Sequence, residues 1–312
     1  ITLNKRGLAD GALYYDREGK LTEQKARLVV MAANGFGTPR LLLNSKSNQF
    51  PQGLANGSGM VGRNLMAHPM MSVAAQFNDD IAAKTYEQTG MFSDEFYESD
   101  PGKRGFVRGF WFLGSGFASP QRAALDAMPS DRATIVPAAL KHGQNRGIQW
   151  GALHHAAFQE RYNYTVGTSM LFEELPDDYN RLELDPTITD EVGVPGIKLY
   201  YKKTENLEKM IEYGVERAKD AFMAGGATKI LNVAPLAEGG AYHLMGTARM
   251  GNDPSTSVVD KWGRSHEVKN LFVIDGSLFV TAGPTVVTCT LQTLALRIAD
   301  YVKDNHQDLL KA

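Results

Sequence analysis

The C-terminal part of the chain constrains the fold most, because a polar loop there joins a short apolar run to a long amphipathic segment. Four consecutive apolar residues, Leu271–Ile274, predict a buried β-strand. The loop Asp275-Gly276-Ser277 follows it. The apolar residues that then recur at the spacing of one helix face are Leu291, Leu294, Ile298 and Val302. A strand, loop and helix in this order is typical of half of a nucleotide-binding α/β fold.

The start of the chain predicts a second unit of this kind. Strands at Ala12–Tyr15 and Ala26–Met31 flank the turn-forming residues Asp16–Gly19, which indicates a β-hairpin. The second strand leads into residues 32–37, and Thr38-Pro39 is expected as the N-cap and first residue of a helix. A helix that begins at a strand end suits a phosphate or nucleotide group.

The pattern changes between these two units. From about His68 to Lys203, short aromatic-rich runs alternate with polar turns, which predicts a mainly β region. Thr204 then caps a predicted helix that Gly225-Gly226 ends. The apolar residues at helical spacing within it are Leu207, Ile211, Val215, Ala218 and Phe222.

Charge and cysteine content exclude some partners. The 312 residues carry 33 Lys and Arg against 35 Asp and Glu, so nothing in the charge favours nucleic acid or an anionic membrane surface. No apolar run approaches the roughly 18 residues that a transmembrane segment needs. The single cysteine, Cys289, excludes an internal disulfide and leaves a cytoplasmic or periplasmic location open. The adjacent His154 and His155 would point apart and make a poor metal pair, so no metal site is expected.

One glycine-rich segment imitates a nucleotide-binding motif. Gly57-Ser58-Gly59-Met60-Val61-Gly62 matches the letters of the dinucleotide fingerprint. That fingerprint holds a pyrophosphate only where a strand enters it and a helix N-terminus leaves it. Here a loop sequence precedes the glycines, and Pro69 limits any helix begun at Arg63. We therefore interpret the segment as a loop whose glycines supply positive φ angles.

His243 is the candidate for acid-base chemistry. A histidine in an apolar context is more often a hydrogen-bonded core residue than a catalytic one. The sequence around it favours function, because the strand end at Asp275-Gly276 and the helix entered through residues 283–285 would direct backbone N–H groups past the sheet edge. An anionic reduced flavin ring would suit that position.

Taken together, these segments resemble the glucose-methanol-choline (GMC) oxidoreductase family. The segments similar to the family's patterns are residues 27–42, 62–69, 180–186, 243–250, 257–260, 270–273 and 275–277. The resemblance spans nearly the whole chain and is with the C-terminal half of FAD-dependent dehydrogenases. Within the family it leans toward bacterial dehydrogenases of polyols, sugars and sugar acids.

The resemblance implies an α/β fold class, with a partial FAD-binding, Rossmann-like domain and an α+β substrate-binding domain with an antiparallel sheet. The implied division is part of the FAD-binding domain at 1–67, the substrate-binding domain at 68–235, and a return to the FAD-binding domain at 236–312. The implied reaction is oxidation of a CH–OH group of a polyol, sugar or sugar derivative by hydride transfer to flavin N5.

The resemblance also implies roles for particular residues. His243 matches the position that takes the hydroxyl proton of the substrate in front of flavin N5. Asp275 and Gly276 match residues that contact the ribityl and pyrophosphate part of FAD. For Asp275 the alternative is a turn residue that binds its own backbone.

Two further pairs of cofactor-binding residues follow from the match. Thr288 and Thr290, at the start of the terminal helix, match positions near the pyrimidine edge of the flavin, with simple helix capping as the alternative. Ala33 and Asn34 stand in the strand-end loop that contacts FAD. Asn34 occupies a position where the family normally has glycine, and asparagine tolerates positive φ better than most residues.

Two departures from the family's pattern leave alternatives open. Val286 stands where the family has a second catalytic His or Asn, so either His243 works alone, a nearby group such as Thr285 substitutes, or the site is impaired. The sequence begins at Ile1 without the family's N-terminal fingerprint. We therefore expect the chain alone to bind FAD poorly and to need the missing N-terminal FAD-binding segment or a partner subunit.

Other functions of the same fold stay open. Some members act as cyanohydrin lyases, and a non-catalytic binding or assembly subunit is a further alternative. For a dehydrogenase, the electron acceptor could be oxygen, a quinone or a cytochrome subunit.

Overall fold

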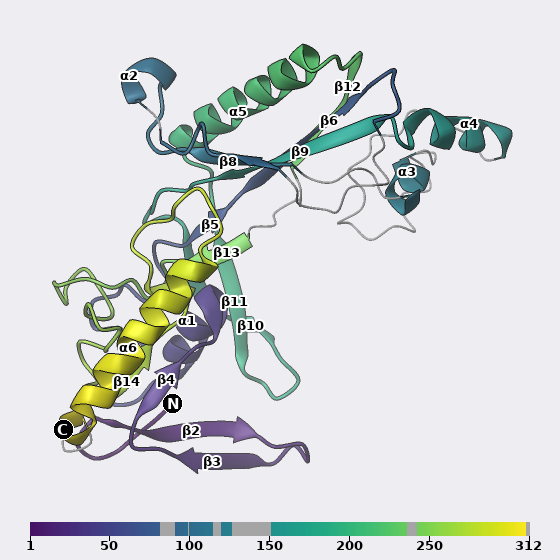
Figure 1. The fold of residues 1–312 in the computed structure, drawn as a ribbon. Coiled ribbons are helices and arrows are strands. Elements are labelled where there is room, and N and C mark those ends of the chain that lie inside the picture. The colour runs from purple at the N-terminus through teal and green to yellow at the C-terminus, as the bar shows by residue number, and fades with distance from the viewer. Residues whose placement is uncertain (82–90, 99, 115–119, 127–150, 236–241, 310–312) are drawn as a thin grey trace. The chain divides into compact units, whose positions relative to one another are not determined.

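The computed structural model describes residues 1–81, 91–98, 100–114, 120–126, 151–235 and 242–309. These residues form two compact units, which we describe separately (Figure 1). Unit 1 comprises Ile1–Ala67, Glu174–Lys202 and His243–Ala312, and unit 2 comprises His68–Glu173 and Lys203–Tyr242.

Unit 1 is built around a parallel pair of short strands. β4 (Val29–Met31) pairs with β14 (Leu271–Val273), with Val30 opposite Phe272. Helix α1 (Asn34–Asn44) follows β4, while the 3-10 turn η4 (Gly276–Leu278) and helix α6 (Thr288–Leu309) follow β14. Both predicted strand-loop-helix units are therefore present, and their strands lie side by side although about 240 residues separate them.

The predicted N-terminal hairpin is present, but its second strand was predicted wrongly. β2 (Ala9–Tyr15) pairs antiparallel with β3 (Leu21–Lys25), and β1 (Thr2–Leu3) adds a third strand. The turn between them closes through the Asp16 carboxylate, which accepts hydrogen bonds from the N–H groups of Glu18 and Lys20. Pairing therefore begins at Leu21, and the apolar residues 29–31 are left for the parallel pair.

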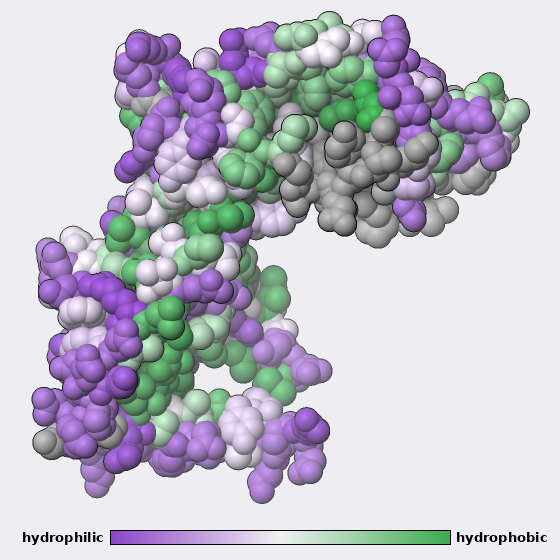
Figure 2. Space-filling model, viewed as in Figure 1, coloured by the Kyte–Doolittle hydropathy of each residue, from purple (hydrophilic) through white to green (hydrophobic). Residues whose placement is uncertain are grey.

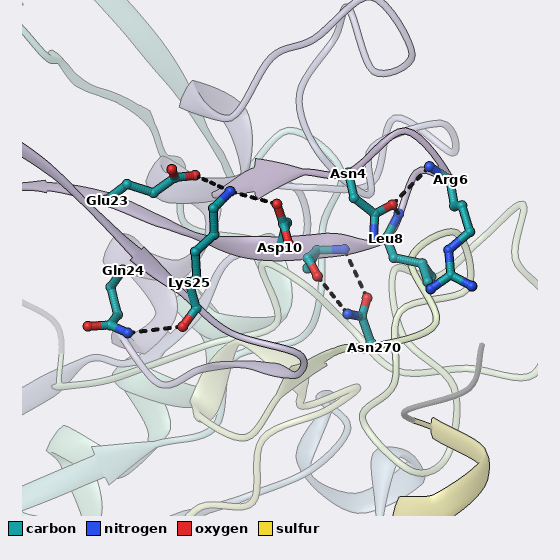
Figure 3. A network of polar contacts seen from close by, with 9 residues as sticks. Asn4, Arg6, Leu8, Asp10, Glu23, Gln24, Lys25 and Asn270 are labelled. Carbon is teal, nitrogen blue, oxygen red and sulfur yellow. Dashed lines mark hydrogen bonds and ion pairs between the residues drawn. The ribbon is translucent and has the colours of Figure 1, made fainter.

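A buried asparagine joins this hairpin to the parallel strands (Figure 3). Asn270 accepts a hydrogen bond from the Ala9 N–H at 2.9 Å and donates to the carbonyls of Ala9 at 2.7 Å and Arg27 at 2.8 Å. Every polar group of this amide is thus used within the protein. The Lys25 ammonium, which pairs with Asp10 and Glu23 nearby, is exposed and contributes little to stability.

Helix α1 begins at Asn34, five residues before Pro39, its predicted first residue. Asn34 has φ 65°, and its side-chain oxygen accepts hydrogen bonds from the N–H groups of Phe36 and Gly37. These two N–H groups of the first turn have no partner within the helix. Pro39 consequently lies inside the helix and cannot donate to the carbonyl of Gly35. The Thr247 hydroxyl donates to that carbonyl instead, at 2.7 Å. A residue 212 positions away thereby replaces the missing helical hydrogen bond.

A long hairpin completes unit 1. β10 (Arg181–Thr189) pairs antiparallel with β11 (Pro195–Tyr200). The Arg40 guanidinium of α1 donates to the Pro195 carbonyl at 2.8 Å and pairs with Asp190 at 2.9 Å. The structure groups residues 174–202 with unit 1, whereas the expected division assigns them to the substrate-binding domain at 68–235.

Unit 2 contains a five-stranded antiparallel sheet. The strands lie in the order β12 (Lys229–Pro235), β6 (Met70–Gln76), β9 (Thr165–Phe172), β8 (Phe110–Leu113) and β7 (Phe92–Ser93). The short helices of the unit are α2 (Pro101–Arg104), α3 (Pro120–Asp126) and α4 (Ala152–Arg161).

The longer helix α5 (Glu205–Ala224) lies along this sheet (Figure 1). The Thr204 side chain accepts a hydrogen bond from the Leu207 N–H at 3.2 Å, and Gly225 ends the helix, as predicted. Leu207 and Met210 are fully buried against the phenyl rings of the sheet, including Phe172. The α/β class with an antiparallel second unit is therefore confirmed. Within the described residues, no helix is both long and apolar enough to cross a bilayer.

Candidate active site

His243 lies on a short strand with an unusual backbone. β13 (Tyr242–Met245) forms a two-stranded sheet with β5 (Met66–His68). His243 has φ 58°, a left-handed conformation that is rare for a residue with a side chain and that often marks a functional position. Its imidazole is half-buried, and this burial lowers its pKa below the ordinary value of 6.5. The lowered pKa favours the neutral form of the imidazole, which is able to accept a proton.

Two glycines hold the strand of His243 against the candidate cofactor-binding residues. A Cβ atom at Gly35 would lie 2.5 Å from the Leu244 carbonyl oxygen, and one at Gly276 would lie 2.6 Å from the same oxygen. Gly246 also donates its N–H to the Gly276 carbonyl at 3.2 Å. The first turn of α1 and the turn after β14 thus meet β13 at backbone contact distance. Leu244, the neighbour of His243, therefore lies in backbone contact with both Gly276 and Gly35 of the first turn of α1.

Asp275 connects the two strand ends. Its buried carboxylate accepts hydrogen bonds from the N–H and hydroxyl of Ser277, at 2.9 and 2.6 Å, and from the Thr38 hydroxyl at 2.5 Å. The Thr38 oxygen in turn accepts from the Ala33 N–H at 3.2 Å. The turn role that the sequence left open for Asp275 is therefore present. Thr38 and Ser277 were missed, because their contribution depends on contacts between distant segments.

Thr288 and Thr290 lie in the first turn of α6 and are exposed. The first N–H groups of a helix have no partner within it, so this end of α6 presents donors and a partial positive charge. Val286 precedes the helix, and 49% of its surface is exposed. An alkyl side chain there offers no group that exchanges protons.

Asn64 is a buried side chain that the sequence analysis did not single out. Only 4% of its surface is exposed, and its amide nitrogen has no hydrogen-bond partner among the described residues. Asn64 lies beside the candidate site, because a Cβ atom at Gly246 would be 2.2 Å from the Asn64 carbonyl oxygen. A buried donor without a protein partner is completed by an ordered water, an ion or a bound group.

Glu174 is a second buried group that was missed. Its carboxylate is fully buried and accepts hydrogen bonds from the Ala67 N–H of β5 at 2.9 Å and from the Tyr201 hydroxyl at 2.7 Å. Burial raises the pKa of Glu174 to about 7. An apolar strand that ends in Glu-Glu-Leu-Pro is the sequence signal at this position. Both carboxylates, Glu173 and Glu174, are buried, and the signal does not tell which of them binds Ala67 and Tyr201.

Solved structures of other proteins share this fold. Pyridoxine 4-oxidase from Mesorbium loti superposes on 96% of the chain with a TM-score of 0.62 and 15% identity, and the match covers 55% of that protein. A formate oxidase variant from Aspergillus oryzae RIB40, described for its FAD modification, superposes on 98% of the chain with a TM-score of 0.67 and 15% identity, covering 59% of that protein. The chain therefore shares its fold with the matching part of these two oxidases.

Comparison of the sequence with known proteins identifies the family. The chain is 36% identical to 2-methyl-1,2-propanediol dehydrogenase of Mycolicibacterium austroafricanum over 98% of its own length and 53% of that protein's. It is 30% identical to the fructose dehydrogenase large subunit of Gluconobacter japonicus over 93% of its own length and 49% of that protein's. Residues 176–295 match the family model described as GMC oxidoreductase. The chain therefore belongs to the GMC oxidoreductases, and it spans about half the length of these relatives.

Proposed function

We propose that this chain is the C-terminal half of a FAD-dependent dehydrogenase that oxidises a CH–OH group of a polyol, sugar or sugar derivative. The observation that carries the proposal is the backbone contact of the His243 strand with Gly35 and Gly276. It gathers a neutral imidazole, a helix start and a strand-end turn at one edge of a parallel pair of strands. The names of the relatives, a propanediol dehydrogenase and a fructose dehydrogenase, support an alcohol or sugar as substrate.

The residues at this edge are suited to FAD. The unpartnered amide of Asn64 offers a buried donor, and the exposed start of α6 offers backbone N–H groups near Thr288 and Thr290. Ala33-Asn34 and Asp275-Gly276 are the residues that would hold the ribityl and pyrophosphate part. When bound, FAD supplies the acceptor for the hydride.

His243 would take the hydroxyl proton of the substrate. The lowered pKa keeps its ring neutral, and a neutral imidazole can accept a proton where an imidazolium cannot. Because Val286 cannot share this task, His243 is proposed to act without a second histidine or asparagine.

Further contacts to the cofactor are proposed to come from polypeptide outside this chain, either an N-terminal segment or a partner subunit. Apolar side chains reach the surface of unit 1 in the region of β4, α1 and α6 (Figure 2). They include Val30, Leu41 and Leu296, which are 45%, 44% and 69% exposed. Exposed apolar groups of this kind mark surfaces that bind other polypeptide. A separate electron-acceptor subunit is also proposed, since relatives include the fructose dehydrogenase large subunit and a gluconate 2-dehydrogenase flavoprotein.

Replacement of His243 by alanine in the full-length, flavin-loaded protein tests the proposal. We expect the rate of flavin reduction by the alcohol to fall about 10²- to 10⁴-fold, because that is the usual contribution of a general base. FAD content should be unchanged. His155→Ala, which removes an exposed imidazole from unit 2, is the matched control and should leave the rate unchanged.

The same assay separates the alternatives. Flavin reduction that is equally fast in the His243→Ala variant would show that another group takes the proton. Cyanide release from a cyanohydrin without flavin reduction would identify a lyase. If the protein binds FAD but catalyses neither reaction, the result would identify a binding or assembly subunit.

A further inference from the structure

Unit 1 contains a cavity of about 580 Å³ that no part of the proposed oxidation uses. Its walls come from the C-terminal end of α1, the loop 52–63 and the first residues of β10. The candidate flavin-binding residues Ala33 and Asn34 lie at the other end of α1, about 13 Å away along the helix, since an α-helix rises about 1.5 Å per residue. Asn64, the buried donor beside the candidate site, directly follows Arg63 of the cavity wall. The cavity is within the size range of small-molecule sites.

The loop that forms one wall is well ordered by its own hydrogen bonds. It contains the glycine-rich segment 57–62, which follows no strand and opens no helix, so it is not a dinucleotide fingerprint. Asn56 accepts a hydrogen bond from the Val61 N–H at 3.0 Å and donates to the Gln52 carbonyl at 3.0 Å. Gly62, at φ 87°, donates its N–H to the Thr247 carbonyl and accepts a hydrogen bond from the Leu182 N–H. The wall is therefore fixed before any ligand arrives.

Cations line this cavity in excess. Lys46, Arg63 and Arg181 face one carboxylate, Glu183, which pairs with Arg181 at 2.6 Å. The Arg63 Nε atom donates to the Gly59 carbonyl at 3.0 Å, which holds its guanidinium at the loop. In the part of the chain that the structure describes, no carboxylate forms an ion pair with Lys46 or Arg63. Two positive charges are thus available to a ligand.

The rest of the lining is mixed. Gln52, Asn56 and Ser58 contribute polar groups, and the apolar side chains are Leu43, Val61, Leu182 and Leu184. Val61 and Leu182 are buried, so they form a fixed surface rather than a mobile one. A small-molecule site combines apolar contact with placed polar and charged groups that orient the ligand. A ligand that fits this cavity has an anionic end and a small body with one apolar face.

We propose that this cavity, which we call the α1–β10 pocket, binds a small organic anion, a carboxylate or a phosphate monoester, through Lys46 and Arg63. The apolar body of the ligand lies on the leucine side chains, and its anionic end lies between the two cations. A guanidinium presents paired donors that match carboxylate and phosphate oxygens. Lys46 and Arg63 have no part in the proposed oxidation, so anion binding is tested independently of that reaction.

Isothermal titration of the full-length, flavin-loaded protein with benzoate, phenyl phosphate and benzyl alcohol tests the proposal. We expect the two anions to bind and the neutral alcohol to show no pocket-dependent binding. Lys46→Gln with Arg63→Gln should raise the Kd of the anions roughly tenfold or more, because two charge-assisted contacts are lost. The stronger of the two anions in the wild-type protein shows whether a carboxylate or a phosphate ester is the better ligand.

A double variant with the same charge change is the control. Arg17→Gln with Lys20→Gln removes two exposed cations from the β2–β3 turn and should leave the Kd within about twofold. Leu184→Glu adds a carboxylate to the apolar lining and should abolish binding of both anions. The proposal is overturned if the Lys46 and Arg63 variant binds as the wild type does, if the control loses binding equally, or if neither anion binds the wild type.

Discussion

Replacing Glu174 by glutamine measures how much the ionisation of a fully buried carboxyl group lowers the unfolding free energy of unit 1. The pKa of Glu174 is raised from an ordinary 4.5 to about 7, chiefly because burial disfavours the carboxylate. A group whose pKa is higher in the folded than in the unfolded protein contributes full stability below the unfolded value. That contribution is lost as the pH rises through the folded value. Stability should therefore fall between about pH 4.5 and pH 7.

The shift sets the size of the effect. A difference of about 2.5 units at about 1.4 kcal/mol per unit corresponds to roughly 3 kcal/mol at pH values well above 7. Glutamine keeps the shape and stays neutral at every pH. Its amide oxygen can accept from the Ala67 N–H, and its amide nitrogen can donate to the Tyr201 oxygen, which reverses the direction of that hydrogen bond.

Urea unfolding of the wild type and of Glu174→Gln between about pH 5 and pH 8.5 is the assay. The unfolding free energy of the variant relative to the wild type should rise with pH by up to roughly 3 kcal/mol. Glu191→Gln, in the exposed β10–β11 turn, should show no such pH dependence. A difference between Glu174→Gln and the wild type that is constant over this range would refute the reasoning, because it would mean that the carboxyl does not titrate there.

Two other changes test the packing behind the candidate site. Thr38→Val removes the hydroxyl that donates to the buried Asp275 carboxylate, and we expect about 1–3 kcal/mol of lost stability in thermal unfolding, with Thr22→Val on the exposed hairpin changing little. An equal loss in both variants would contradict this. Gly276→Ala places a Cβ atom 2.6 Å from the Leu244 carbonyl oxygen and should displace the His243 strand, so that FAD content and flavin reduction both fall. Gly102→Ala, whose Cβ would meet only a side-chain oxygen at 3.3 Å, is the control, and unchanged flavin reduction in Gly276→Ala would show that the glycine contact does not position the strand.

Features encoded in short segments were predicted well. The Thr204 cap and the apolar spacing of α5 are local, and both are present as predicted. The strand-loop-helix units at residues 29–44 and 271–309 also follow from local patterns. The start of α1 was predicted wrongly because a Thr-Pro pair is a strong N-cap signal on its own. Only the distant Thr247 hydroxyl makes an internal Pro39 acceptable.

By itself, the sequence determined the class of fold, the family pattern and the candidate residues, because periodicity, capping and motifs reside in neighbouring residues. Tertiary structure alone decided which residues share a site. Gly35 and Gly276 meet one carbonyl of β13, Glu174 is buried beside Ala67, and the α1–β10 pocket joins residues 43–63 to residues 181–184. Burial and charge pairing depend on contacts between such distant segments. No local pattern could therefore show that Glu174 titrates near neutral pH or that Lys46 and Arg63 lack acidic partners in the described part of the chain.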